Sequence, residues 1–155
     1  MSEKLFYAIR SEDLETVKET LKKDPALVHA KDQRGSTPLL LATYYGFESI
    51  TDFLLGLQPD LNEKDGSGNT ALMGVCFKGH EEIARKLIEA GADLNIQNGM
   101  GGTALSFAAM FNKVSLVKLL LDHGADKSIK DNRGMTALQQ AEAQGFKEVA
   151  DLLRD

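Results

Sequence analysis

The chain repeats itself every 33 residues, and this period constrains its fold more than any other feature of the sequence. Six residue series keep the period. They are an acid or amide (Asp32, Asp65, Asn98, Asp131), a glycine (Gly35, Gly68, Gly101, Gly134), a threonine (Thr37, Thr70, Thr103, Thr136), two leucines (Leu39, Leu72, Leu105, Leu138 and Leu54, Leu87, Leu120, Leu153) and a second glycine that is once an asparagine (Gly46, Gly79, Asn112, Gly145). Such a period predicts a solenoid, in which each unit packs only against its neighbours.

Each unit is predicted to form a turn, two short helices and a loop. Asp65 followed three residues later by Gly68 suits a type I turn. Thr70 suits the N-cap of the first helix, and Gly79 suits the left-handed residue that ends it. The second helix is expected over 81–88, where acids precede bases in the order that complements the helix dipole.

The chain resembles the ankyrin-repeat family in these motifs: Thr-Pro-Leu at 37–39, Thr-Ala-Leu at 70–72, 103–105 and 136–138, Gly-His at 79–80 and Gly-Ala-Asp-Leu-Asn at 91–95. The resemblance covers nearly the whole chain. It implies an all-α fold, an ankyrin-repeat solenoid of about five helix-turn-helix repeats joined by β-turn loops. Within a single domain over 1–155 it places a divergent capping repeat at about 4–35, full repeats at 36–68, 69–101 and 102–134, and a truncated capping repeat at 135–155. Both ends are polar, as a solenoid cap requires, so we expect a monomer.

Two departures from the family pattern bear on local structure. The family usually places a histidine after Thr-Pro-Leu, where it bonds to the threonine. Leu40, Met73, Ser106 and Gln139 occupy that position here. We expect the turns at Leu40 and Met73 to lack that bond. In the first repeat, Glu12 and Asp13 stand in place of the glycine that ends the first helix.

Composition narrows the possible partners. The net charge is -5 and the isoelectric point is about 5.2, so the chain lacks the basic surface that nucleic acids or an anionic membrane would require. No apolar stretch is long enough to span a bilayer, and no signal peptide is recognisable. Cys76 is the single cysteine, which excludes an internal disulfide. We expect a cytoplasmic protein.

Candidate chemistry is sparse. Cys76 and His80 lie four residues apart, a spacing that can hold a metal on a helix. Cys76 falls on the packed face of the first helix, so a buried, inert thiol is the favoured interpretation. No catalytic or metal-binding residues and no cofactor are therefore predicted. The alternatives are an enzyme or a small-molecule or metal binder with a site grafted on the solenoid, and an idle structural scaffold.

By resemblance to the family, residues just before the glycine that ends each first helix face a concave groove, and the turn tips form its edge. We expect a non-catalytic protein–protein interaction module that binds an unidentified protein partner there. The predicted contacts are a central anchor of Tyr44, Tyr45, Phe77, Met110 and Phe111, with polar contacts from Arg34, Lys78 and Arg133. Exposed aromatic side chains are typical binding anchors. The alternative is that several of these rings pack against the next repeat.

Overall fold

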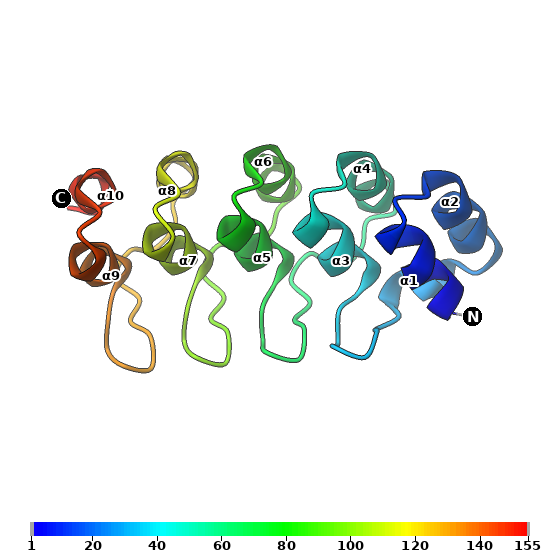
Figure 1. Ribbon diagram of the computed structural model, residues 1–155, viewed down its shortest axis with the longest axis horizontal. Helices are drawn as coiled ribbons and strands as arrows, with labels where there is room; N and C mark the ends of the chain where they lie inside the picture. Colours follow the sequence, from blue (N-terminus) through cyan, green and yellow to red (C-terminus); the bar gives the residue numbers. More distant parts are fainter. Residues whose placement is uncertain (1, 155) are drawn as a thin grey trace.

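The computed structural model describes residues 2–154, which form ten α-helices, one 3-10 helix and no strand. Their bounds are α1 Ser2–Arg10, α2 Leu14–Lys23, η1 Pro25–His29, α3 Pro38–Tyr45, α4 Glu48–Gly56, α5 Ala71–Lys78, α6 Glu81–Glu89, α7 Ala104–Met110, α8 Val114–Asp122, α9 Ala137–Gln144 and α10 Lys147–Leu153. Consecutive α-helices pack in pairs, and the pairs stand side by side in chain order (Figure 1). The predicted all-α solenoid is confirmed. The number of repeats and the boundaries given above stay predictions.

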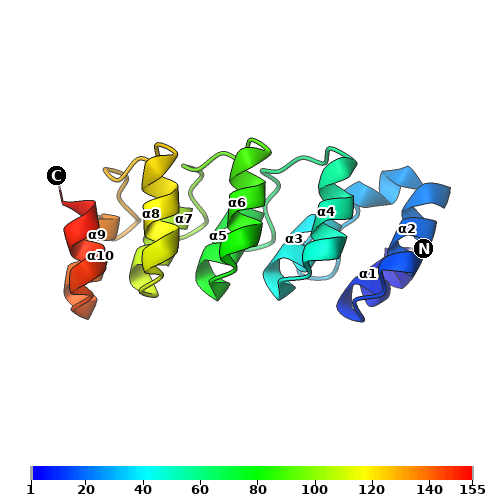
Figure 2. The ribbon, with the colours of Figure 1, turned by 90° about the horizontal axis from the view of Figure 1, so that it is seen from above.

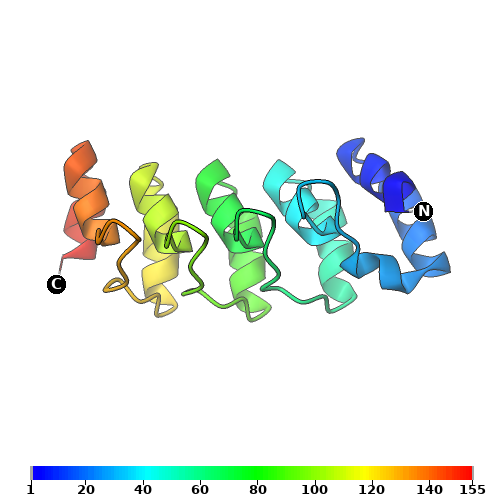
Figure 3. The ribbon, with the colours of Figure 1, turned by 90° about the horizontal axis from the view of Figure 1, so that it is seen from below.

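The pairs form two rows of helices. The inner row holds α1, α3, α5, α7 and α9, each in contact with the next, and the outer row holds α2, α4, α6, α8 and α10. Figure 2 shows the outer helices side by side from above, and Figure 3 shows the inner helices and the turn loops from below. In Figure 1 the loops project away from the helices, on the side of the inner row opposite the outer row.

Side-chain caps begin the inner helices, and left-handed residues end several of them. The hydroxyl of Thr37 accepts a hydrogen bond from the Leu40 backbone N–H at 3.2 Å, and Thr70, Thr103 and Thr136 act in the same way. Left-handed backbone follows α3 at Gly46 (φ 78°) and α7 at Asn112 (φ 58°). Both predictions for the helix ends are confirmed.

The four threonine caps differ in one respect. The hydroxyl of Ser106 and the amide oxygen of Gln139 accept a return bond from the backbone N–H of their threonines, at 2.8 and 2.9 Å, which completes a capping box in α7 and α9. Leu40 has no polar side-chain atom to make this bond, and the buried Met73 has only a weakly accepting thioether. The expected difference between these turns is therefore confirmed.

Hydrogen bonds hold the turn tips in register along the stack. Within each turn an acid or amide oxygen accepts two backbone N–H groups; Asp65 Oδ1 accepts them from Ser67 and Asn69 at 2.9 Å each. Between turns, the Gly66 N–H donates to the Arg34 carbonyl oxygen at 3.0 Å. The equivalent bonds run from Gly99 N–H to Ser67 and from Asn132 N–H to Met100. The tips are thus fixed relative to one another.

The core runs along the whole stack instead of gathering at one centre. The leucines of the repeating series on the outer helices, Leu54, Leu87 and Leu120, are fully buried. The apolar side of each helix pair is buried against the next pair, as expected for a solenoid, in which each repeat is stabilised by its neighbours. This packing leaves one side of the inner helices uncovered between them and the turn tips.

Candidate protein-binding groove

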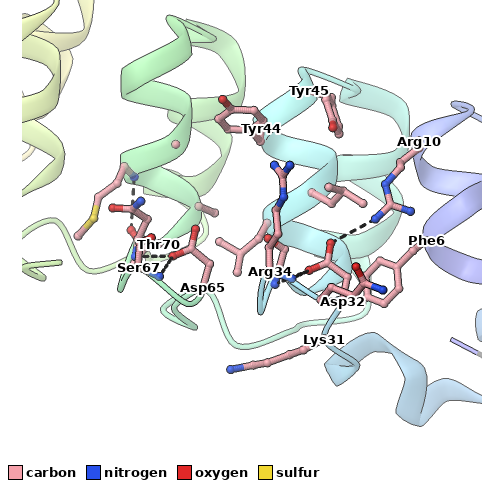
Figure 4. Close-up of a pocket in the computed structure, with 18 of the residues that line it drawn as sticks. Phe6, Arg10, Lys31, Asp32, Arg34, Tyr44, Tyr45, Asp65, Ser67 and Thr70 are labelled. Carbon is pink, nitrogen blue, oxygen red and sulfur yellow. Dashed lines mark hydrogen bonds and ion pairs between the residues drawn. The ribbon is translucent and has the colours of Figure 1, made fainter. Parts of the chain in front are cut away.

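A groove of about 1420 Å³ lies between the inner helices and the turn tips in the N-terminal half of the stack. Its walls come from α1, α3 and α5 on one side and from the tips around residues 31–36 and 65–70 on the other. Figure 4 shows Tyr44 and Tyr45 on α3 above the tip residues Arg34, Asp65 and Ser67. Four of the predicted contact residues line this groove: Arg34, Tyr44, Tyr45 and Phe77.

The predicted aromatic anchors are half exposed. Tyr44, Tyr45, Phe77 and Phe111 keep 38%, 44%, 41% and 39% of their surface accessible. Their remaining surface packs against neighbours, and their role in binding a partner stays a prediction. Rings that are held in place and still accessible lose little entropy on binding.

The rings form two groups on the inner row. Tyr44 and Tyr45 meet edge to face with their centroids 5.7 Å apart. One repeat further along, Phe77 meets Phe111 at 4.8 Å and Phe107 at 6.5 Å, both edge to face. Edge-to-face geometry is favourable for aromatic pairs, so it fixes the orientation of these rings. Tyr44 lies on α3 and Phe77 on α5, two inner helices that pack directly together.

Lys78 joins the first ring group through its charge. Its ammonium nitrogen lies 5.1 Å from the centroid of the Tyr44 ring, within cation–π range. The side chain is exposed. Lys78 is not among the residues that line the groove, but its charge lies over the ring of Tyr44, which does line it.

The predicted contacts Met110, Phe111 and Arg133 lie further toward the C-terminal end of the stack, outside the residues that line this groove. Arg133 is bound within its own turn, because its guanidinium donates to Asp131 Oδ2 at 3.1 Å. Backbone hydrogen bonding from Met135, together with the Arg133 side chain, holds the pKa of Asp131 below its usual value. Arg133 is thus partly committed to a structural role.

The two arginines that line the groove, Arg10 and Arg34, differ in whether they form an ion pair. Arg10, on α1, pairs with Asp32 at 3.3 Å, and the Asp32 side chain is only 8% exposed. Arg34 is exposed, and its guanidinium has no ion-pair partner within residues 2–154. The free cation at this edge of the groove is therefore Arg34.

Sequence reasoning missed several residues that line the groove: Phe6, Tyr7, Met73, Gly74 and Phe107. Among residues 2–154, Tyr7 is the most exposed large apolar residue, at 72%. The six repeating series start only at residue 32, so they give no register for α1. The available signal was the alignment of Glu12 and Asp13 with the glycine that ends the first helix of each repeat. The left-handed backbone of Glu12 (φ 57°), 34 residues before Gly46, confirms that alignment.

The alternative site at Cys76 and His80 is not assembled. Cys76 is fully buried, and burial raises the pKa of its thiol to about 12. His80 turns to the preceding inner helix, with Nε2 3.0 Å from the Tyr44 carbonyl oxygen. His29 and His123 have other partners, Glu63 and the Leu119 carbonyl. Over residues 2–154 no group of three or more His, Cys, Asp or Glu side chains is placed to hold a metal ion.

Comparison with known proteins bears on the family. A family model for ankyrin repeats (3 copies) matches residues 5–98 and 94–155. A comparison with curated proteins finds no match. None of the helices between residues 2 and 154 is long and apolar enough to cross a bilayer.

Proposed function

Because the chain belongs to the ankyrin-repeat family, whose repeats generally serve as protein–protein interaction modules, we propose that it binds a partner protein through its groove and the adjoining inner-helix surface. Repeats of this family are typically non-catalytic, and we propose the same here. The observation that carries the proposal is the set of half-exposed rings held in place along the inner helices.

The proposed contacts combine apolar anchors with charge. Tyr44, Tyr45 and Phe77 supply aromatic surface in the groove, and Met110 and Phe111 extend it along α7 and its end. Aromatic side chains are over-represented among residues that dominate binding energy. Arg34, Lys78 and Arg133 are the proposed polar contacts, with Arg34 and Lys78 the freer two. Rim charges of this kind set orientation and association rate more than affinity.

Capture of partners by the immobilised chain tests this proposal. Tyr44, Phe77 and Phe111 are replaced together by serine, and the proteins retained from a lysate are quantified by mass spectrometry. The matched control replaces three exposed residues away from the groove, Leu57, Lys118 and Lys147, by serine. We expect the groove variant to lose the partners that the wild type and the control retain. A groove variant with an unchanged circular dichroism spectrum and unchanged partners would show that the face is wrong.

We further propose that the protein acts as a cytoplasmic monomer. The buried, free thiol of Cys76 is compatible with a reducing compartment, where cysteines persist unpaired. Light scattering is expected to give the mass of one chain, 16.9 kDa. Twice that mass would overturn the monomer.

A further inference from the structure

Gly74 leaves a gap in the row of side chains that the inner helices present to the groove. The same register holds Leu41 on α3, Phe107 on α7 and Gln140 on α9. Gly74 lies inside α5, where glycine is less favourable than alanine because the flexible unfolded backbone loses more entropy. Leu41 and Phe107 line the groove beside it.

The packing of the protein does not require glycine at this position. A methyl group at Gly74 would meet one atom within 4 Å, Cδ1 of Tyr44, at 3.4 Å, and Gly74 keeps a helical backbone. By contrast, a methyl group at Gly35 would lie 2.8 Å from the Gly66 nitrogen, so glycine there is a structural necessity. The space above Gly74 is therefore open to the groove and not taken by a neighbour.

The open space is an apolar pit. The ring of Tyr44 on α3 is the nearest side chain. Phe77, three residues further along α5, and Phe107 on α7 also line the groove, and their rings meet edge to face. Met73, 1% exposed, precedes Gly74 and belongs to the core beneath it. A pit with apolar walls and a backbone floor fits an aliphatic side chain better than a polar one, because a polar group would lose water without gaining a partner.

Charges around the pit favour acidic residues in the occupant. The carboxylate of Asp32 is taken by Arg10 and by the backbone N–H groups of Arg34 and Ser36, and Asp65 Oδ1 is taken by its own turn. Within the described residues 2–154, the guanidinium of Arg34 has no ion-pair partner, and the ammonium group of Lys78 contacts the Tyr44 ring and has no ion-pair partner. Asp65 keeps its negative charge, because backbone N–H groups do not neutralise a carboxylate, and it lies in a turn tip. Glu3 lies on α1, two inner helices from Gly74.

We propose that the Gly74 pit receives an aliphatic side chain of a partner peptide whose flanking acidic residues pair with Arg34 and Lys78. This inference rests on the proposed function and adds the chemistry of the partner. The whole chain has a net charge of -5, so its overall field repels an acidic segment, and the local cations Arg34 and Lys78 favour binding beside the pit. The cations thus determine where the acidic peptide binds, and the shape of the pit determines which of its side chains is inserted.

Peptide arrays test the proposal directly. The first array carries a central leucine between glutamates, the second replaces the glutamates by lysines, and the third replaces the leucine by serine. The labelled full chain is expected to bind the first array at least about tenfold more strongly than the other two. Gly74→Leu fills the pit from within and is expected to weaken binding to the first array about tenfold. Gly74→Ala adds one methyl group and is expected to bind with intermediate strength.

Thermal unfolding is the control for correct folding, and both Gly74 variants are expected to have melting temperatures no lower than that of wild type. If Gly74→Leu melts at a lower temperature than wild type, its weaker binding is not interpretable, and the double variant R34E/K78E tests the inference instead. This double variant is expected to bind the lysine array more strongly than the glutamate array. Equal binding to all three arrays, binding to none, or an unaffected Gly74→Leu variant that melts as expected overturns the inference. If the serine variant of Tyr44, Phe77 and Phe111 still loses its lysate partners in those cases, the proposed function stands and only the partner chemistry is wrong.

Discussion

The imidazole of His80 caps the end of the preceding inner helix, because its Nε2 atom lies 3.0 Å from the carbonyl oxygen of Tyr44. Carbonyls in the last turn of a helix have no intrahelical donor, so His80 supplies one from the next repeat. The ring also lies against Gly46, where a methyl group would come within 2.8 Å of Cε1. The spacing of His80 from Cys76 is compatible with a metal site, but in the structure His80 joins two repeats by contacting Tyr44 and Gly46.

Replacing His80 by alanine is expected to lower the free energy of unfolding by about 0.5–1.5 kcal/mol, the usual contribution of one hydrogen bond. Urea denaturation measures it. His80→Phe is the matched control, because Phe47 and Phe146 occupy the same register. The phenylalanine ring keeps the apolar contact but cannot donate the hydrogen bond, so the stability of His80→Phe should lie between that of wild type and that of His80→Ala. Identical stability of all three proteins would show that the bond contributes nothing.

Glu12 is expected to be a strained position. Its backbone is left-handed (φ 57°), where a side chain costs about 1 kcal/mol and where Gly46, Gly79 and Gly145 end the other helices. Glu12→Gly should raise the free energy of unfolding by about 0.5–1 kcal/mol, partly offset by a more flexible unfolded chain. Glu12→Ala keeps a side chain on the left-handed backbone, so its free energy of unfolding should not rise above that of wild type. A glycine variant less stable than wild type in urea would refute this.

Much of the fold could be predicted from the sequence because each signal is local. Threonine caps, helix-ending glycines and turn acids act through hydrogen bonds within a few residues, so a residue such as Thr103 or Asn112 identifies its own role. The 3-10 helix Pro25–His29 had no repeating counterpart to predict it. The first unit departs from the strict period, because the step from Glu12 to Gly46 is 34 residues and not 33, but the sequence still aligned Glu12 with the helix-ending glycines.

The groove was harder to predict because its shape depends on side-chain size at one register position. The sequence places Tyr44, Phe77 and Met110 two residues before the left-handed positions Gly46, Gly79 and Asn112. It does not show that Phe107 packs against Phe77 while Gly74 leaves space beside Tyr44. Whether an arginine is free is also a matter of contact: Arg133 donates to Asp131, whereas Arg34 has no ion-pair partner within residues 2–154.

The buried hydroxyl of Thr51 has no hydrogen-bond partner among residues 2–154, so Thr51→Val is expected to stabilise the protein. The register of Thr51 is apolar in the other units, with Val17, Ala84, Val117 and Ala150. Valine keeps the branched shape and removes an unpaired polar group that costs about 1–3 kcal/mol when buried. We expect the free energy of unfolding in urea to rise by about 1 kcal/mol.

Thr51→Ser is the control for Thr51→Val, since serine retains the hydroxyl and loses the methyl group. It is expected to be less stable than wild type, because the lost methyl leaves a small cavity. A valine variant that is less stable than wild type would mean that the hydroxyl has a partner, such as a buried water molecule.

Cys76 makes stability depend on pH above the neutral range. Burial raises the pKa of its thiol from 9.0 to about 12, so the unfolded chain releases this proton at lower pH than the folded protein does. The free energy of unfolding should therefore be unaffected by Cys76 below pH 9 and fall between about pH 9 and 12, by about 1.4 kcal/mol per pH unit. Cys76→Ala isolates this contribution from the other groups that titrate there. Alanine stands at the same register in Ala109, which is also fully buried, so the variant is expected to fold.

The measurement is the difference in stability between wild type and Cys76→Ala, taken from urea curves at several pH values. Wild type is expected to lose stability relative to the variant only on the alkaline side. The same burial predicts that a thiol reagent at neutral pH reacts with unfolded and not with native protein, because the thiolate is the reactive form. Parallel pH profiles, or rapid labelling of native protein, would place the thiol at the surface and so contradict the packing of α5 against its neighbours.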